Sequence, residues 1–348
     1  MALPAVDEDA PLVTPSPQSF DVVKHFGALL ERDDPMPAPV AAMEALAELV
    51  SRSDSSTIQE LLALLRQASA QIAASSFNPV SAQSGTSLFL RFLTLQRPPP
   101  EMSFREFKAE LVSRAREFVR DSGKCRATIA AHMSNFIQDG NTLLRVVIQA
   151  LLYAAQTQKK RFQVYVTESR PFGLGLKTHA VLTEAGIPCI VVLDSAVAYI
   201  MSKCDLAVVG AEAVCESGGL VNFIGGYQMA IAAKAMGKPF YALAESFKFT
   251  RLFPLSQYDI PSSLPSAPLA FPEFDDPVST KSTSVPPTPV RPMIHSKMPE
   301  ALEMSDEATR HNPILDYTTP DHITLIVSDI GVMTPSGVSD ALLAVYAE

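Results

Sequence analysis

The stretch IPCIVVLDSAVAYIMSKCDLAVVG (residues 187–210), continued by PFYALA at 239–244, carries the clearest signal of the architecture. Its short apolar runs, IPCIVVL, DLAVVG and PFYALA, have the length and composition of buried strands, and segments of helical periodicity separate them. Gly186 and Gly237 follow two helical segments, and a proline opens the next strand two residues after each, which is typical of helix ends. Strands alternating with helices predict a parallel sheet covered on both faces.

The same pattern extends in both directions. FQVYVTE (162–168) predicts an earlier strand, and HITLIVS (322–328) predicts a later one that is followed by a final helix after Pro335. Between them, residues 261–305 are rich in Pro, Ser and Thr and show no periodicity, so they are predicted to be a disordered insertion. The C-terminal residues therefore complete a sheet that the insertion interrupts.

Residues 20–140 have a helical period instead. Apolar residues recur at i, i+3, i+4 and i+7 in two segments, first at Met43, Leu46, Ala47 and Val50, then at Ile58, Leu61, Leu62 and Leu65.

Capping-box spacing marks the starts of two helices in this region, at Ser56 with Gln59 and at Ser103 with Glu106. Three prolines at 98–100 break the array. A further helix carrying Ile129, Met133 and Ile137 is expected to stop near Gly140.

The predicted fold class is therefore α/β, with an all-helical N-terminal domain followed by a Rossmann-like parallel-sheet domain. We expect a disordered tail at residues 1–19, the helical domain at 20–140, and the α/β domain at 141–348 with its insertion at 261–305.

Composition excludes several classes of function. The net charge of −9, with no run rich in Lys and Arg, disfavours binding to nucleic acid. Four widely spaced cysteines, without a CxxC pair or a histidine cluster, favour free buried thiols over a zinc site or a disulfide framework. An acidic, proline-rich N-terminal segment lacks the regions of a signal peptide, and no apolar run could span a membrane. We expect a cytoplasmic protein with no metal and no membrane contact.

Ligands of open parallel sheets bind beyond the carboxyl ends of the strands. The candidate ligand-binding residues at these ends are Glu168, Arg170, Asp194, Glu212, Asn222, Gly225 and Gly226, and Glu245 occupies a similar place.

The glycine pair Gly225-Gly226 opens a predicted helix near Tyr227. Free N–H groups and the positive end of the helix dipole could hold a phosphate there. The simpler interpretation, which the residue types favour, is a tight loop that requires positive φ. The carboxylates Glu168, Asp194 and Glu212 could act as acid or base, although such residues more often cap the helix that follows a strand.

No GxSxG, HExxH or phosphate-binding P-loop motif is present, and neither Ser134 nor Ser195 has an identifiable base. We therefore predict no catalytic residues. AESFKFTRLFPL (244–255) mixes three phenylalanines with Lys248 and Arg251, and in an acidic chain this indicates packing or a protein interface more than nucleic-acid stacking.

Together these segments resemble the alpha-type subunits of eukaryotic translation initiation factor 2B. The resemblance spans nearly the whole chain apart from the tail and the insertion, and the strings AESFKF, RLFPL and VSDIGVMTPSGVSD are specific to this branch. It is carried by VYVTES (164–169), VVLDSAVAYIMSKCDLAVVGAEAV (191–214), QMAIAAKAMGKPFYALAESFKFTRLFPL (228–255), LDYTTPDHITLIVSDIGVMTPSGVSD (315–340), and, in the helical region, PVAAMEAL (39–46), LFLRFLTL (88–95) and NFIQDG (135–140).

The resemblance implies a regulatory, non-catalytic subunit of the guanine-nucleotide exchange complex. Such subunits form a homodimer through the Rossmann-like domain and assemble with the beta and delta subunits, and with gamma and epsilon in the whole complex. They help to sense initiation factor 2 when its alpha subunit is phosphorylated. The resemblance also implies that the helical domain carries the regulatory surface, and that no cofactor is needed.

The alternative is a sugar-phosphate-binding or isomerase-like protein, because the same fold occurs in methylthioribose-1-phosphate isomerase. Those isomerases use a cysteine in a T-H-C-N-type turn and an aspartate in an N-G-D turn. Here Ser217-Gly218-Gly219 replaces the N-G-D turn, and no counterpart of the cysteine turn follows Leu144. An acidic group and a thiol brought together at the crevice of the sheet from elsewhere would overturn the non-catalytic interpretation.

Binding residues depart from the family pattern as well. Asn222-Phe223-Ile224-Gly225-Gly226 stands in place of N-K-I-G-T, so a retained ligand, a sugar phosphate or a nucleoside monophosphate, would rely mainly on backbone N–H groups. The missing turn leaves residues 142–158 to supply a strand, a connection and a helix, which is feasible only if the strand is short. An error in the sequence is the other explanation.

Overall fold

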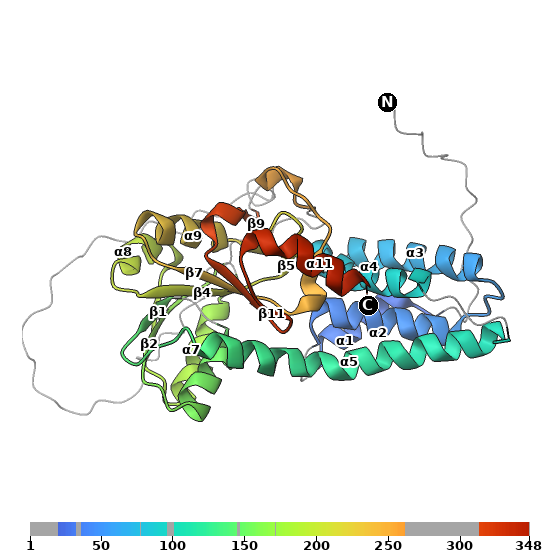
Figure 1. Ribbon diagram of the computed structural model, residues 1–348, viewed down its shortest axis with the longest axis horizontal. Helices are drawn as coiled ribbons and strands as arrows, with labels where there is room; N and C mark the ends of the chain where they lie inside the picture. Colours follow the sequence, from blue (N-terminus) through green and yellow to red (C-terminus); the bar gives the residue numbers. More distant parts are fainter. Residues whose placement is uncertain are drawn as a thin grey trace, which may run out of the picture.

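The computed structural model describes most of the chain. The described residues are 20–32, 36–76, 78–95, 101–144, 147–170, 172–261 and 313–347. The predicted tail at 1–19, the prolines at 98–100 and nearly all of the insertion at 261–305 lie outside them, so those predictions stay predictions. Figure 1 shows helices α1 to α5 at one end of the molecule and the α/β layers at the other, with the long helix α5 running beneath both.

Five helices form the N-terminal part of the described chain, and α2 lies at its centre, in contact with α1, α3, α4 and α5. The apolar stripe predicted on α2 is confirmed, since all four of its members are buried. The helices are α1 (Val22–Leu30), α2 (Ala38–Arg52), α3 (Ile58–Ser75), α4 (Pro79–Leu95) and α5 (Phe104–Ser134).

Capping boxes begin two of these helices. At α5 the predicted pair is confirmed: the Glu106 N–H donates to the Ser103 hydroxyl, and the Ser103 N–H donates to the Glu106 carboxylate. At α3 the predicted pair is wrong by one position, because Thr57 and not Ser56 caps the helix and Glu60 closes the box. A carboxylate is a stronger acceptor for backbone N–H groups than the neighbouring glutamine amide, and this selects the register.

The separate helix predicted around Ile129 and Met133 is wrong, because both residues belong to α5, which continues unbroken to Ser134. A single interior glycine does not stop a helix of this length. Beyond its end, the Lys160 ammonium donates to the carbonyl oxygens of Ser134 and Ile137 at 2.7 and 2.8 Å. Helix α5 therefore joins the helical part to the core beneath the sheet, where Ile129 and Met133 are buried.

A seven-stranded sheet forms the main layer of the α/β part of the described chain, in the order β11-β10-β7-β4-β1-β2-β3. All neighbouring pairs are parallel except β10 with β11. The predicted α/β class is confirmed. The strands are β1 (Thr142–Leu144), β2 (Gln163–Thr167), β3 (Cys189–Val192), β4 (Leu206–Gly210), β7 (Phe240–Leu243), β10 (Leu325–Ser328) and β11 (Gly331–Met333).

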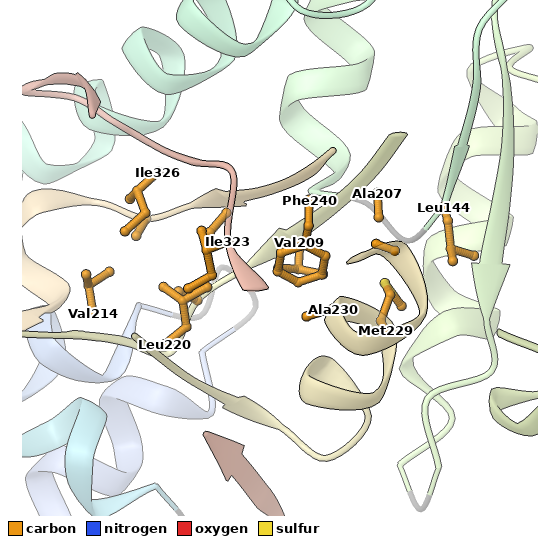
Figure 2. Packing of buried hydrophobic residues seen from close by; sticks show 14 of the residues in the cluster. Leu144, Ala207, Val209, Val214, Leu220, Met229, Ala230, Phe240, Ile323 and Ile326 are labelled. Atoms are coloured by element: carbon orange, nitrogen blue, oxygen red, sulfur yellow. The ribbon is translucent and has the colours of Figure 1, made fainter. Parts of the chain in front are cut away.

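Helices cover the sheet as the alternating pattern predicts. Figure 2 shows Met229 and Ala230 of α9 packed toward Val209 and Phe240 of the sheet, within a core that also holds Leu144. Short 3₁₀ turns lie at 194–196, 246–248, 257–259, 320–322 and 335–337. The helices are α6 (Ile148–Leu152), extended by a π-helical turn at Tyr153–Thr157, α7 (Leu174–Glu184), α8 (Val197–Met201), α9 (Gly226–Ala235) and α11 (Val338–Ala347).

Two predictions about individual strands have different outcomes. The first strand, β1, is only three residues long, as the shortened segment requires, and Val147 already precedes helix α6. The run IPCIVVL is not a buried strand, because β3 lies at the edge of the sheet, where Ile190 is 51% exposed and Leu193 is 60% exposed. An apolar run of this length does not reveal whether a strand has neighbours on both sides.

A second, four-stranded sheet is a feature that the sequence reasoning missed. Its order is β8-β5-β6-β9, and most of its pairs are antiparallel. Its strands are too short for a period to be recognised, and Gly218 at φ +84° forms the turn between two of them. The strands are β5 (Ala213–Cys215), β6 (Leu220–Phe223), β8 (Phe249–Thr250) and β9 (Leu315–Thr318).

Candidate functional site

A cleft opens at the carboxyl ends of the central strands. It consists of a cavity of about 430 Å³ and an adjoining one of about 230 Å³, which share Val147, Thr178, Gly210 and Lys248. Val147 follows β1 and Gly210 ends β4, and the chain leaves these neighbouring strands in opposite directions along the sheet. The cleft therefore lies at the topological switch point, where parallel α/β sheets bind ligands.

The structure brings only some of the predicted residues to this cleft. Glu212 and Asn222 line the smaller cavity, and Glu245 lines the larger one. The other predicted residues line neither cavity; they are Glu168, Arg170, Asp194, Gly225 and Gly226.

Asp194 connects two strand ends. Its carboxylate accepts hydrogen bonds from the backbone N–H groups of Ser169 and Arg170 at 3.0 and 2.8 Å. These bonds hold the turn after β2, where Ser169 has the unusual φ of +58° for a residue with a side chain. Beside it, the Arg170 guanidinium lies 3.4 Å from the Glu168 carboxylate. This arrangement fits the structural role that the sequence left open for these groups, which is to orient backbone at a strand end.

The start of helix α9 is occupied by a carboxylate from the protein itself. Gly225 has φ +102°, so the tight-loop interpretation of this glycine is supported. The N–H groups of Gly225 and Tyr227 donate to the same Asp316 oxygen, Oδ2, at 2.8 and 2.9 Å. A phosphate at this helix start would need the same N–H groups. The backbone donors on which a retained ligand was expected to rely are therefore already engaged.

Glu212 and Asn222 also make internal contacts. The Asn78 amide, at the start of α4, donates to the Glu212 carboxylate at 3.1 Å and so ties the helical part to the α/β part. The Asn222 amide donates to the Gly210 carbonyl at 2.5 Å, and its oxygen accepts from the Phe223 N–H. Both residues therefore shape the wall of the cleft.

A buried charge cluster lies in the larger cavity. Glu245 is 8% exposed, and its carboxylate lies 2.9 Å from the Lys248 ammonium and 3.0 Å from the Arg126 guanidinium. Lys248 also donates to the Ala211 carbonyl. Burial alone would raise the pKa of Glu245, but the charges and hydrogen bonds of Lys248 and Arg126 outweigh it and lower that pKa. The three groups form a satisfied network with one excess positive charge.

A thiol and a carboxylate do approach each other near this cluster. Burial, and then the charge of Asp329 and its hydrogen bond to the thiol, raise the pKa of Cys125 to about 12. A thiol with this pKa stays protonated, whereas a nucleophilic cysteine needs a lowered pKa. The Asp329 carboxylate already accepts from the N–H and hydroxyl of Ser246 at 2.7 Å, and neither Cys125 nor Asp329 lines the cleft. The pair therefore does not supply the reactive groups of an isomerase.

The turn that replaces N-G-D has no room for an acidic side chain. A Cβ atom at Gly219 would overlap the Tyr317 ring, and one at Gly218 would overlap the Pro335 carbonyl. The Tyr317 hydroxyl is in turn hydrogen-bonded to the Ser217 hydroxyl at 2.7 Å. Packing thus leaves no space in this turn for the aspartate of the N-G-D pattern.

Sequence reasoning missed several residues of the cleft. Lys248 was assigned to packing or an interface, although its position shortly after a strand end could have indicated the site. Arg126 belongs to α5 and lies 119 positions before its partner Glu245, so no local pattern signals it. Val147 reaches the cleft because β1 is so short.

Two classes of site are not found in the described part of the chain. No group of three or more His, Cys, Asp and Glu side chains there is placed to hold a metal ion. No helix among the described residues has the length and apolar character to cross a membrane.

The fold is thus a helical array joined to a Rossmann-like domain, with a cleft at the topological switch point of the sheet. The chain belongs to the initiation factor 2 subunit family, whose sequence profile matches residues 33–335. The resemblance drawn from the sequence motifs is thereby confirmed.

Relatives within this class are of two kinds. Translation initiation factor eIF2B subunit alpha of Dictyostelium discoideum is 38% identical over 94% of this chain and 98% of its own length. Ribose 1,5-bisphosphate isomerase of Methanocaldococcus jannaschii is 26% identical and covers 85% of each chain. A chain of the tetrameric eIF2B-beta2-delta2 complex from C. thermophilum has the same fold, with a TM-score of 0.67 at 20% identity over 93% of this chain and 94% of its own.

Proposed function

We propose that this chain is a regulatory, non-catalytic subunit of the initiation factor 2B exchange complex, of the alpha type. It acts in the cytoplasm, where it contributes to assembly of the complex and to sensing of phosphorylated initiation factor 2. The observation that carries the proposal is the 38% identity to an eIF2B alpha subunit along 94% of the chain. The contacts inside the cleft also support the proposal, because they hold groups that an isomerase would need for proton transfer.

The chemical argument concerns what an isomerase of this fold needs. Proton transfer on a sugar phosphate requires a group that can accept and return a proton near neutral pH. Glu245 has a lowered pKa and is held by two cations, and Cys125 has a pKa of about 12. Neither group has the pKa for this task, so the cleft favours the regulatory function over the isomerase activity of the archaeal relative.

The partners proposed are a second copy of the chain, the beta and delta subunits, and through them gamma and epsilon. The surface that we assign to the homodimer is the open edge of the large sheet. Leu193 and Tyr199, which follow β3, are 60% and 72% exposed, and Ile190 lies beside them on the edge strand. An unpaired apolar edge is a liability unless a partner covers it.

The cleft can hold a small anion as a second, subordinate function. Its excess positive charge, from Lys248 and Arg126 against Glu245, suits a sugar phosphate or a nucleoside monophosphate, and the isomerase relatives share the fold. Thermal shift with ribose 5-phosphate and AMP tests this. A rise in melting temperature that is lost in Lys248→Met supports the ligand class, and no rise at millimolar concentration contradicts it.

Affinity purification from cells tests the main proposal. The tagged full chain is expected to recover the other subunits of initiation factor 2B, together with factor 2. Arg66→Glu, an exposed substitution on α3, serves as a control for charge and expression and is expected to recover them equally. Recovery of the tagged chain with none of the initiation-factor subunits contradicts the proposal.

A further inference from the structure

A groove runs along the outer surface of the helical part, between helix α5 and the loop that joins α2 to α3. We call it the α5 groove and define it by residues 50–56, at the end of α2 and in the loop that follows, and by α5 residues 104–120. Its volume is about 930 Å³, and serine hydroxyls and apolar side chains make up much of its wall. It is separate from the cleft of the α/β part and shares no residue with it.

The α5 groove is basic although the whole chain is acidic. Four cations line it, Arg105, Lys108, Arg116 and Arg120, against the single carboxylate of Asp54. Arg116 is paired with carboxylates of α2, so the other three cations against Asp54 leave an excess of two positive charges. This contrasts with a net charge of −9 for the chain. A local field of this sign concentrates anions in the groove.

The four cations differ in what they already bind. Lys108 donates to two backbone carbonyls of the loop, at 2.7 and 3.3 Å, and Arg116 lies 2.9 Å from Glu48 of helix α2. Arg105 and Arg120 are exposed, and neither makes an ion pair with any described residue. The two positions are about 22 Å apart along the helix axis at 1.5 Å per residue, and both guanidinium groups are available to an incoming anion.

The segment that precedes the described residues starts at the rim of this groove. The Phe20 ring lies against the Arg52 guanidinium, 4.9 Å from ring centroid to the guanidinium carbon. Arg52 stands between Ser51 and Ser53, both of which line the groove. Residues 1–19 therefore join the described chain next to the α5 groove.

The same segment has the complementary charge. It carries Asp7, Glu8 and Asp9 in succession and no Lys or Arg. From Asp9 to Phe20 the chain can span up to about 36 Å, which exceeds the length of the groove. We propose that the acidic triplet Asp7–Asp9 binds in the α5 groove, attracted by the positive charges of Arg105 and Arg120.

Because the acidic segment and the α5 groove belong to one chain, even a weak interaction between them gives high occupancy. A tether of about eleven residues gives an effective concentration on the order of 1 mM. If the free segment binds the groove with a Kd of about 100 µM, the attached segment occupies it about nine-tenths of the time and weakens a competing copy about tenfold. The segment thus shields the α5 groove from other anions.

Competition with a labelled peptide tests the inference. A fluorescent peptide of residues 1–19 is titrated at low salt with the natural full chain and with the full chain carrying D7N, E8Q and D9N. Two further variants add either Arg105→Glu with Arg120→Glu, or Arg66→Glu with Arg161→Glu, to the neutralised chain. The last pair makes the same change of charge outside the groove, and melting temperatures show that each variant is folded.

The neutralised chain and its Arg66/Arg161 variant are expected to bind the peptide equally. The natural chain is expected to bind it about tenfold more weakly, and the Arg105/Arg120 variant at least tenfold more weakly. Equal affinity for the natural and neutralised chains, undiminished affinity of the Arg105/Arg120 variant, or no binding to the neutralised chain at 1 mM would each overturn the proposal. None of these outcomes depends on whether the chain belongs to the exchange complex.

Discussion

The Asp316 carboxylate accepts a hydrogen bond from the Gly225 N–H at 2.8 Å, across 91 positions of the sequence. The same oxygen, Oδ2, accepts from the Tyr227 N–H, so one side chain satisfies two of the free donors at the start of α9. A glycine pair that opens a helix looks like a phosphate site from sequence. In the folded chain a strand of the second sheet supplies the anion.

Removing this carboxylate should destabilise the fold and expose the donors. Asp316→Ala is expected to lower the free energy of unfolding by about 1–2 kcal/mol, because a helix cap and its interaction with the dipole are lost. Urea denaturation at pH 7 measures this. Phosphate at 10 mM should then raise the melting temperature of Asp316→Ala but not that of the natural chain.

Asp316→Asn is the matched control for this test, since the amide oxygen can still accept a hydrogen bond while the charge is absent. Its loss of stability should be smaller than that of Asp316→Ala. If Asp316→Ala were as stable as the natural chain, the cap would have no energetic importance.

Breaking the buried cluster at Glu245 should have a larger effect. Glu245→Gln leaves the largely buried Lys248 ammonium without its carboxylate, and it also removes the partner of the half-exposed Arg126. We expect a loss of about 3 kcal/mol in the free energy of unfolding. Glu110→Gln removes one partner of the exposed pair with Arg114 and should change stability by less than about 0.5 kcal/mol. Similar losses in both variants would contradict the importance given to burial.

The pH dependence of stability follows from the lowered pKa of Glu245. The unfolded chain binds a proton at the Glu245 carboxylate at a higher pH than the folded chain does. The stabilisation that ionised Glu245 gives the folded chain is therefore fully present at pH values above the pKa of an ordinary carboxyl group. It is lost as the pH falls below that value and through the folded pKa. Between pH 5 and pH 3 the natural chain should therefore lose more stability than Glu245→Gln. If the stability of the two proteins fell equally between pH 5 and pH 3, the pKa of Glu245 would not be lowered in the folded chain.

The thiol beside Asp329 should be unreactive. With its pKa raised to about 12, Cys125 should react with iodoacetamide at pH 7.5 at least about a hundredfold more slowly than free cysteine. Asp329→Asn removes the negative charge and should accelerate the reaction at Cys125, which peptide mass spectrometry can follow residue by residue. Rapid alkylation of Cys125 in the natural chain would mean that its environment is not the one described.

Self-association should depend on the open edge of the large sheet. Tyr199→Asp places a charge among the exposed apolar side chains that follow β3, and it should convert a dimer into a monomer at micromolar concentration. Leu95→Asp makes the same kind of change on the helical part and should leave the dimer intact. Size-exclusion chromatography with light scattering distinguishes the two, and a natural chain that is strictly monomeric would refute the dimer itself.

The sequence predicted the elements that have a recognisable period or cap. The stripe on α2, the Ser103 box and the alternation around Gly186 and Gly237 are local signals, and the structure contains all of them. The short strand β1 also followed from counting residues.

What could not be predicted depends on pairings between distant parts of the chain. The run IPCIVVL lies at an edge because β3 is the last strand in the sheet order, and the residues of the run do not reveal that order. The carboxylate at α9 comes from Asp316, and the cation beside Glu245 comes from α5. Only the assembled fold shows that these groups already bind the polar side chains and backbone donors of the candidate site.

The most direct test of the non-catalytic account is a turnover assay on the purified full chain. Methylthioribose 1-phosphate and ribose 1,5-bisphosphate are incubated with it at micromolar protein, and phosphorus NMR follows the products. The isomerase of Methanocaldococcus jannaschii serves as a positive control for the second substrate. We predict no conversion above the rate without protein. A measurable isomerase rate with either substrate would contradict the account.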